Sequence, residues 1–238
     1  MCELTMSILT NEKTIEQYAS DFVAKIRRIT VRTGYNHQEV FSRWVDWSFW
    51  LTMAETRKTA EEMGQSKHVP YTIEECMNKA FSARDFLLDD GLGPVFGEMQ
   101  TIWIEASLTH EEEFGIHVVA NNELTGVLDK KDKGQVFTPN NLAQLMSRLT
   151  GTEGGKAYDG CAGYGGLIIA DFYTGGHNKK PLGSRVYYAG ELNTTTAKVC
   201  YLNMVCHMIP GVVMNQNTLL EHREPIHPKW ITPLGLML

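Results

Sequence analysis

The sequence of 238 residues has no uninterrupted apolar run of the roughly 18 residues that a membrane-spanning helix needs. Its first residues, Met1 to Glu3, carry neither the basic flank nor the apolar segment of a secretion signal. Basic residues are also scarce. The 22 lysines and arginines stand against 28 aspartates and glutamates, a formal charge of −6, which excludes a protein that coats nucleic acid over much of its surface. We therefore expect a cytoplasmic protein with no membrane contact, in which DNA contact needs a partner or a local basic patch.

The five cysteines include no C-x-x-C pair, which argues against a structural zinc site and against a redox motif. An odd number of cysteines, without the spacing of a C-x-x-C pair, predicts reduced thiols. His222 and His227 follow Cys206 and His207, but their spacing matches no structural zinc pattern, so we expect no metal site. The chain is 43% apolar and is long enough to bury a core without disulfides.

The first half of the chain has no glycine-rich loop and predicts three or more helices. Capping-box patterns begin at Thr14, Asn36 and Thr72, and each is followed by apolar residues at helical spacing. A polar, charged segment from 109 to 133 then predicts a hinge. We therefore place a helical domain at 1–128 and a second domain at 129–238.

Aromatic residues gather in one of these predicted helices: Phe41, Trp44, Trp47, Phe49 and Trp50. Rings at this spacing are usually packed in a core or between domains, and we favour that interpretation. The alternative is a surface on which nucleic-acid bases stack. The lysines at 130, 131 and 133 have a similar pair of interpretations, either a solvated loop or a contact with a phosphate backbone.

The second half alternates between strands and helices. The pattern predicts strands at 157–159, 185–191 and 211–215, and helices at 167–173 and 194–208. Alternation of this kind is typical of a parallel sheet.

Three polar segments follow these strands, and the carboxyl ends of parallel strands are where such sheets bind ligands. They are the glycine loop from Asp159 to Gly166, Glu191, and the segment 216–219. A carboxylate at the position of Glu191 can accept both hydroxyls of a ribose, so together these ends favour a ligand that contains adenosine. Each also has a structural explanation: a tight turn, a charge at a helix start, and a turn residue.

Four segments resemble the motifs of a known family, in the same order. They are Lys133-Gly-Gln-Val-Phe-Thr-Pro139, Tyr158-Asp-Gly-Cys-Ala-Gly-Tyr-Gly-Gly-Leu167, Ala189-Gly-Glu-Leu-Asn193 with Ala197 and Asn203, and Asn217-Thr-Leu219. Over roughly residues 130–222 the chain is similar to the N6-adenine DNA methylases, in particular to the methylation subunit of type I restriction-modification systems. The resemblance implies an α/β fold: an N-terminal helical domain, then a partial class I, Rossmann-like methyltransferase parallel sheet with helices.

The resemblance also implies S-adenosylmethionine as the cofactor. Phe137 and Thr138 would close over its methionine part, Asp159 and the loop backbone would hold its amino acid end, Glu191 would bind the ribose, and Asn217 would face the adenine amino group. The full set of cofactor-binding residues expected on this basis is Phe137, Thr138, Pro139, Asp159, Gly160, Cys161, Gly163, Glu191, Leu192 and Asn217.

The sequence departs from the family at three points. Gly160 replaces a proline, Asn217 replaces an aspartate, and the catalytic [Asn/Asp]-Pro-Pro-aromatic motif is missing, because the chain contains no Pro-Pro pair. Residues 227–233 are at best a remnant of the following strand. No catalytic residue is therefore assigned. We expect either a short paralogue or one part of a split methylase, inactive alone, or alternatively a non-enzymatic protein that mimics or regulates a methylase subunit.

Association with another chain is expected because half of a methyltransferase sheet leaves an open edge. The apolar residues 230–238 either pack back on the sheet or dock on another subunit. The expected partners are a second copy of the chain, or a methylase or specificity subunit.

Overall fold

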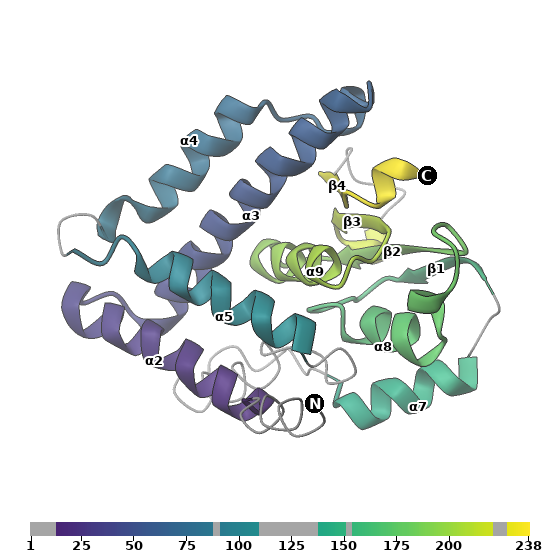
Figure 1. Ribbon diagram of the computed structural model, residues 1–238, viewed down its shortest axis with the longest axis horizontal. Coiled ribbons are helices and arrows are strands. Elements are labelled where there is room, and N and C mark those ends of the chain that lie inside the picture. The colour runs from purple at the N-terminus through teal and green to yellow at the C-terminus, as the bar shows by residue number, and fades with distance from the viewer. Residues whose placement is uncertain (1–12, 88–90, 110–137, 151–153, 221–227) are drawn as a thin grey trace, which may run out of the picture.

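The amino-terminal part of the protein is helical. The computed structural model describes residues 13–87, 91–109, 138–150, 154–220 and 228–238. The first helices are α2 (Ile15–Thr33), α3 (His37–Glu62), α4 (Ile73–Arg84) and α5 (Val95–Thr109), with 3-10 turns at Ser66–His68 and Asp85–Leu87. Helix α3 packs against α4, and α2 packs against α5 (Figure 1). The prediction of three or more helices is confirmed.

The predicted capping residues begin three of these helices. Thr14 accepts a hydrogen bond from the backbone N–H of Gln17, whose side chain accepts one from the N–H of Thr14. Thr72 and Glu75 form the same reciprocal pair at α4. The side chain of Asn36 caps α3. Each cap satisfies a backbone donor that the helix leaves free and contributes about 1 kcal/mol.

The aromatic residues of α3 are packed inside the protein, so the packing interpretation is confirmed. Trp44 is fully buried, and its ring centroid lies 4.9 Å from that of Phe22 in α2 and 4.9 Å from that of Trp103 in α5. Phe49 is also fully buried, and its ring lies 4.6 Å from that of Trp230 near the end of the chain. These rings join the helical part to the rest of the molecule.

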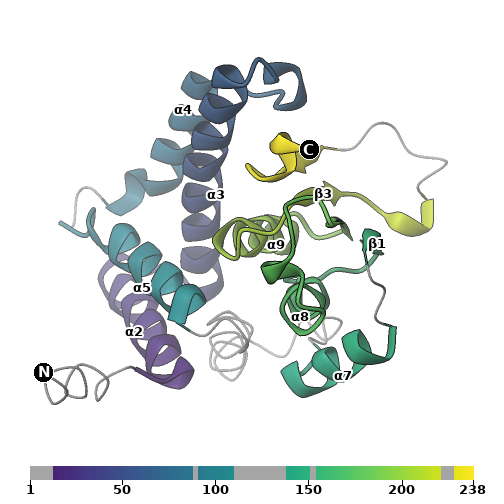
Figure 2. The same cartoon turned by 45° about the vertical axis from the view of Figure 1, so that its right-hand side comes forward.

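The second part is an α/β unit with the sheet order β1-β2-β3-β4. Strands β1 (Gly155–Asp159), β2 (Arg185–Glu191) and β3 (Gly211–Asn215) are parallel. Helix α8 (Gly166–Thr174) connects β1 to β2, and α9 (Thr194–Cys206) connects β2 to β3. Helix α7 (Asn140–Thr150) packs on α8 (Figure 2). The expected helical start followed by a parallel sheet with helices is confirmed.

Helix α9 lies between the sheet and the helical part, where it packs on β2, β3, α3 and α5. Nine of the 13 residues of α9 are buried, even Lys198, whose ammonium lies 2.5 Å from the carboxylate of Asp46 in α3. The hydroxyls of Tyr201 in α9 and Thr56 in α3 are hydrogen-bonded at 2.8 Å. Polar and aromatic contacts therefore fix α9 between the two parts.

The last strand has three residues and lies within the segment 227–233, where at best a remnant of a strand was expected. Residues Lys229–Ile231 form β4, which pairs with β3 in the antiparallel direction and is not a further parallel strand. Trp230 within β4 is buried. The residues after β4 turn back on this chain: Leu236 is buried, and the Thr232 hydroxyl accepts a hydrogen bond from the N–H of Gly211 at 3.0 Å. Of the two alternatives for the apolar tail, packing back on the sheet is the one observed.

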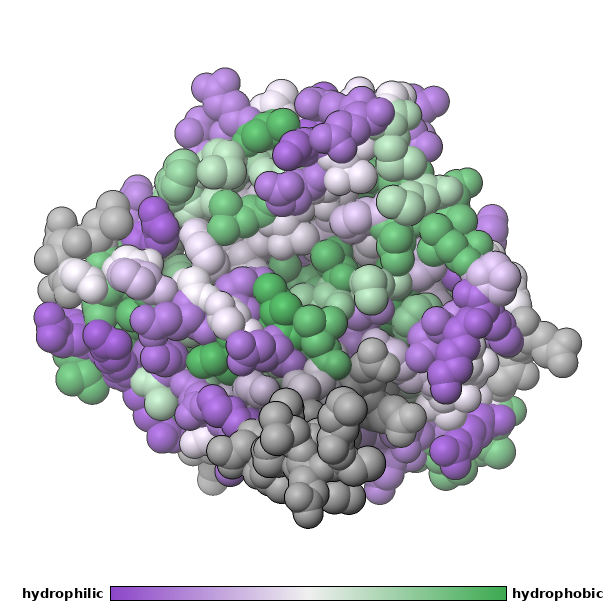
Figure 3. All heavy atoms as spheres, in the orientation of Figure 1, coloured by the Kyte–Doolittle hydropathy of each residue, from purple (hydrophilic) through white to green (hydrophobic). Residues whose placement is uncertain are grey.

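Figure 3 shows polar side chains spread over the outer helices of one face and apolar side chains gathered nearer its centre. Within the residues that the structure describes, no helix is both long and apolar enough to span a membrane. Several features singled out in the sequence lie outside the described residues. They are the lysines at 130, 131 and 133, most of the predicted hinge, Phe137, His222 and His227.

Candidate functional site

The carboxyl ends of the three parallel strands bring the predicted site residues to one edge of the sheet. Asp159 ends β1 and pairs in register with Ala189 of β2, and Glu191 ends β2 and pairs with Asn215 of β3. The glycine loop follows β1 directly and leads into α8. This is the edge at which open parallel sheets bind ligands.

The glycine loop is held by the strand beside it and by α9. The N–H of Ala162 donates to the carbonyl of Gly190 at 2.9 Å. The side-chain amide of Asn203 donates to the carbonyl of Tyr164 at 2.8 Å, and Asn203 is fully buried. Gly165 has a φ of 88°, in the left-handed region that favours glycine, and is the residue before α8. The loop therefore has a fixed path between β1 and α8.

Glu191 contacts this loop through its side chain. One carboxylate oxygen accepts a hydrogen bond from the N–H of Gly163 at 3.1 Å, and the other accepts one from the N–H of Asn193 at 2.8 Å. A carboxylate has about four lone-pair directions, so two acceptor positions remain for hydroxyl groups. Glu191 is half-buried, so part of the residue is exposed to solvent.

Glycine at position 190 permits a close approach between strands and loops. A Cβ atom there would lie 2.5 Å from the Thr218 methyl group and 3.2 Å from the hydroxyl of Tyr158. Thr218 itself donates a hydrogen bond from its hydroxyl to the carbonyl of Gly160 at 2.8 Å. The loop after β1 and the turn after β3 thus meet over Gly190.

Asp159 carries a partly unused carboxylate. One oxygen accepts a hydrogen bond from the N–H of Cys161 at 3.1 Å. The other is buried and has no hydrogen-bond partner among the described residues. Burial raises the pKa of Asp159, and the bond from Cys161 opposes this effect only in part. A positively charged ligand group would relieve the cost of burying this charge.

The remaining predicted residues either follow one of the three strands or precede α7. The Asn217 side-chain oxygen accepts from the N–H of Leu219 at 3.1 Å, which leaves its NH2 group for a ligand. Leu192 is 68% exposed, and Cys161 is an exposed free thiol. Thr138 and Pro139 directly precede α7, and no hydrogen bond joins them to the glycine loop within the described residues.

Sequence reasoning missed the residues that support the site. The side-chain amide of Asn215 donates to the carbonyls of Glu191 and Leu192 at 3.0 and 2.9 Å, and its oxygen accepts from the hydroxyl of Thr194. Thr218 and Asn203 were noted only as part of a motif, without a role. A polar residue at the end of a buried strand, as Asn215 is, was the available signal.

Parallel strands, a glycine loop and an acidic residue after the second strand define an α/β domain of the Rossmann-like type. Residues 122–230 match the family described as N-6 DNA methylase. The type I restriction enzyme MpnII methylase subunit of Mycoplasma pneumoniae is 33% identical over 97 residues, which cover 37% of this chain and 17% of that protein. The resemblance to this family, and to its type I methylase subunits, is confirmed for this part of the chain.

A solved relative is a type I restriction-modification methyltransferase subunit from Streptococcus thermophilus. It is 15% identical, with a TM-score of 0.48, and the alignment covers 83% of this chain and 57% of that one. The chain therefore spans 17% of the length of the curated relative and just over half of the solved one.

Proposed function

We propose that this protein binds S-adenosylmethionine at the carboxyl edge of the sheet and serves as the cofactor-binding part of an N6-adenine DNA methylase. The contact between Glu191 and the glycine loop carries the proposal, because a carboxylate with two remaining acceptor positions lies beside this loop at the carboxyl edge of the sheet. The family similarity of residues 122–230 supports it independently.

The residues present fit this cofactor. The buried, unpartnered oxygen of Asp159 suits the ammonium of its methionine part, and Glu191 suits its ribose hydroxyls. We assign the adenine ring to the NH2 group of Asn217, which no hydrogen bond within the described residues uses, and to the exposed side chain of Leu192. When bound, S-adenosylmethionine supplies a methyl group on a positively charged sulfur. The protein binds and orients it.

The test is calorimetric titration of the full chain with S-adenosylmethionine and with S-adenosylhomocysteine. Saturable binding of both, at one site per chain, is expected. S-adenosylhomocysteine lacks the methyl group but keeps the ammonium and the ribose, so it should bind through the same residues. If neither ligand gives heat at millimolar concentration, the cofactor proposal is wrong and the non-enzymatic mimic becomes the better interpretation.

We further propose that this chain does not transfer the methyl group by itself. Its sequence has no Pro-Pro pair, and the Pro-Pro-aromatic motif is what orients the adenine amino group in the family. A radiolabelled methyl assay on DNA of mixed sequence tests this. Label in DNA well above background with the purified chain would refute it.

The partner is proposed to pair with β1. Strand β1 is at the edge of the sheet and pairs only with β2 within the described residues. The helix before it in the chain, α7, packs on α8 and exposes the apolar side chains of Leu142, Leu145, Met146 and Leu149, which are 40–77% exposed. A methylase or specificity subunit, or a second copy of this chain, could cover both features. Light scattering of the chain alone, and co-purification with each type of subunit, distinguishes these partners.

A further inference from the structure

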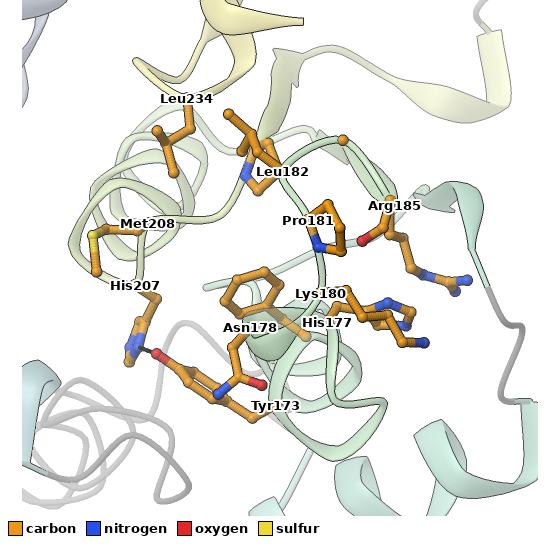
Figure 4. A pocket seen from close by; sticks show the side chains of 14 residues that line it. Tyr173, His177, Asn178, Lys180, Pro181, Leu182, Arg185, His207, Met208 and Leu234 are labelled. Atoms are coloured by element: carbon orange, nitrogen blue, oxygen red, sulfur yellow. Dashed lines mark hydrogen bonds between the residues drawn. The ribbon is translucent and has the colours of Figure 1, made fainter.

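A cavity lies at the edge of the sheet opposite the candidate site, where β2 and β3 begin. It has a volume of about 260 Å3 and lies between the end of α8, the segment 177–185, the turn after α9, and Leu234. Figure 4 shows its walls. Strand β2 has seven residues, which at about 3.3 Å each places Glu191 roughly 20 Å away. The glycine loop and the residues proposed to bind the cofactor do not line this cavity.

The polar lining of the cavity is basic. His177, Lys180, Arg185 and His207 contribute to its wall, and no aspartate or glutamate does. The positive charge of Arg185 is balanced by the buried Asp171, which does not line the cavity, since the guanidinium lies 2.6 Å from its carboxylate. Lys180 is exposed and has no ion-pair partner within the described residues, so it supplies the net positive charge.

His177 presents an unused ring nitrogen. The residue is 4% exposed, and its Nε2 lies 3.9 Å from the carboxylate of Asp171. Its Nδ1 is buried without a hydrogen-bond partner in the part of the chain that the structure describes. Figure 4 shows His177 with Lys180 and Arg185 on the same side of the cavity.

His207, on another part of the cavity wall, also has one ring nitrogen without a partner among the described residues. It is 2% exposed, and its Nδ1 lies 3.1 Å from the hydroxyl of Tyr173. If the hydroxyl donates to Nδ1, the ring proton is on Nε2, which is buried and has no partner among the described residues. Burial lowers the pKa of both histidines. Buried polar atoms normally have partners, so two unpartnered nitrogens at one cavity point to a ligand with polar atoms. The Nε2–H of His207 needs an acceptor, and His177 donates from Nδ1 when its ring binds a second proton, which a bound anion favours.

The rest of the wall is apolar and consists mainly of Phe172, Pro181, Leu182, Met208 and Leu234. Sites for drug-sized ligands measure about 300 to 1,000 Å3, so this cavity suits a smaller molecule. An aromatic or aliphatic body would contact the apolar wall while an anionic group faced Lys180 and the imidazoles.

We propose that this cavity is a second binding site, which takes a small organic anion: one phosphate or carboxylate group on an apolar or aromatic body. The anion contacts Lys180 and the ring nitrogen of His177, and the body lies against Phe172 and Leu182. The site is separate from the proposed cofactor edge and does not depend on it.

The experiment uses phenyl phosphate and benzoate as probes, with inorganic phosphate and phenol as the two halves of the ligand. Binding to the full chain is followed by NMR of the imidazole groups, which are assigned with His177→Gln and His207→Gln. Saturable shifts of the His177 resonance are expected with phenyl phosphate or benzoate, and weaker binding with either half alone. The relative affinity of the two probes tells a phosphate site from a carboxylate site.

Lys180→Ala and its neighbour Lys179→Ala are the matched pair, because only Lys180 lines the cavity. Lys180→Ala should weaken binding about two- to fivefold, the effect of one exposed charge, whereas Lys179→Ala should not change it. Both lysines are exposed, so both variants should fold. The proposal is overturned if no probe shifts either histidine at millimolar concentration, or if the two lysine variants weaken binding equally.

Discussion

The carboxylate of Glu191 accepts a hydrogen bond from the backbone N–H of Gly163, which precedes it by 28 residues. This bond joins the end of β2 to the loop after β1. Because the other carboxylate oxygen holds the N–H of Asn193 at the start of α9, one side chain fixes the backbone on both sides of the candidate site. The proposed ligand contact and the shape of the loop therefore depend on the same residue.

Replacement of Glu191 should weaken the binding of S-adenosylmethionine. Glu191→Ala removes two charge-assisted hydrogen bonds to the ligand, a loss of roughly 2 to 3 kcal/mol. Glu191→Gln keeps one acceptor oxygen and should lose less. Calorimetry of both variants measures this. Glu55→Ala, at an exposed carboxylate of α3, is the control and should bind like the wild type. Equal affinity of Glu191→Ala and wild type would contradict the proposed ribose contact.

Asp159→Asn should stabilise the ligand-free protein and weaken cofactor binding. Burial raises the pKa of Asp159, so its stabilising contribution is greatest below the ordinary pKa of 3.8 and is lost as the pH rises through the folded-state pKa. The asparagine keeps the bond from Cys161 without a charge. Thermal unfolding at pH 7 should therefore give a higher Tm for the variant. A lower Tm, with unchanged affinity, would count against a ligand-facing carboxylate.

Much of the candidate site at the carboxyl edge of the sheet could be predicted from the sequence, because parallel strands that alternate with helices have their carboxyl ends at the same edge. The strands at 185–191 and 211–215 were predicted with the bounds observed. Asp159 and Glu191 therefore lie at the same edge, as expected. Local periodicity and the glycine loop contain this information.

The rest depends on contacts between distant residues, which local patterns do not contain. Strand β4 pairs with β3 in the antiparallel direction, and its Trp230 packs on Phe49, some 180 residues earlier in the chain. The role of Asn203 depends on where α9 lies against the glycine loop. The basic cavity combines residues of α8, the segment 177–185 and the turn after α9, and no single motif marks it.

Gly190→Ala should disrupt the contact between the two loops. The added methyl group would lie 2.5 Å from the methyl of Thr218, so Thr218 must move away from the carbonyl of Gly160. Overpacking of this kind costs typically about 1 to 3 kcal/mol of unfolding free energy. Urea denaturation measures it. The double variant with Thr218→Ser removes the clashing methyl but keeps the hydroxyl, and should recover most of the loss. No recovery would show that the clash is not the cause.

Trp230→Ala should destabilise the single chain. Trp230 is 4% exposed and packs on the rings of Phe49 and Tyr201, so its truncation should cost about 3 to 5 kcal/mol. Met237→Ala, at a half-exposed residue of the same tail, should change the free energy of unfolding by about 0.5 kcal/mol or less. A Trp230 variant that alters only the oligomeric state would mean that the tail serves an interface between chains.

The stability of the protein should depend on pH through His207. Burial lowers its pKa from 6.5 to about 4. Above pH 6.5 the ring is neutral in both states, so it contributes no pH dependence. Between pH 6.5 and 4 the unfolded chain binds a proton that the folded protein does not, and the free energy of unfolding falls by about 1.4 kcal/mol per pH unit. The total loss is about 3 kcal/mol, and it is complete only below pH 4, where the folded protein binds the proton too.

His207→Asn removes this titration and keeps an acceptor for the hydroxyl of Tyr173. Urea denaturation of both proteins at pH 7 and pH 4 gives the comparison. The stability of the wild type relative to the variant should decrease by about 3 kcal/mol between these pH values. If the difference between wild type and His207→Asn is the same at both pH values, the ring of His207 binds its proton as readily in the folded protein as in the unfolded chain.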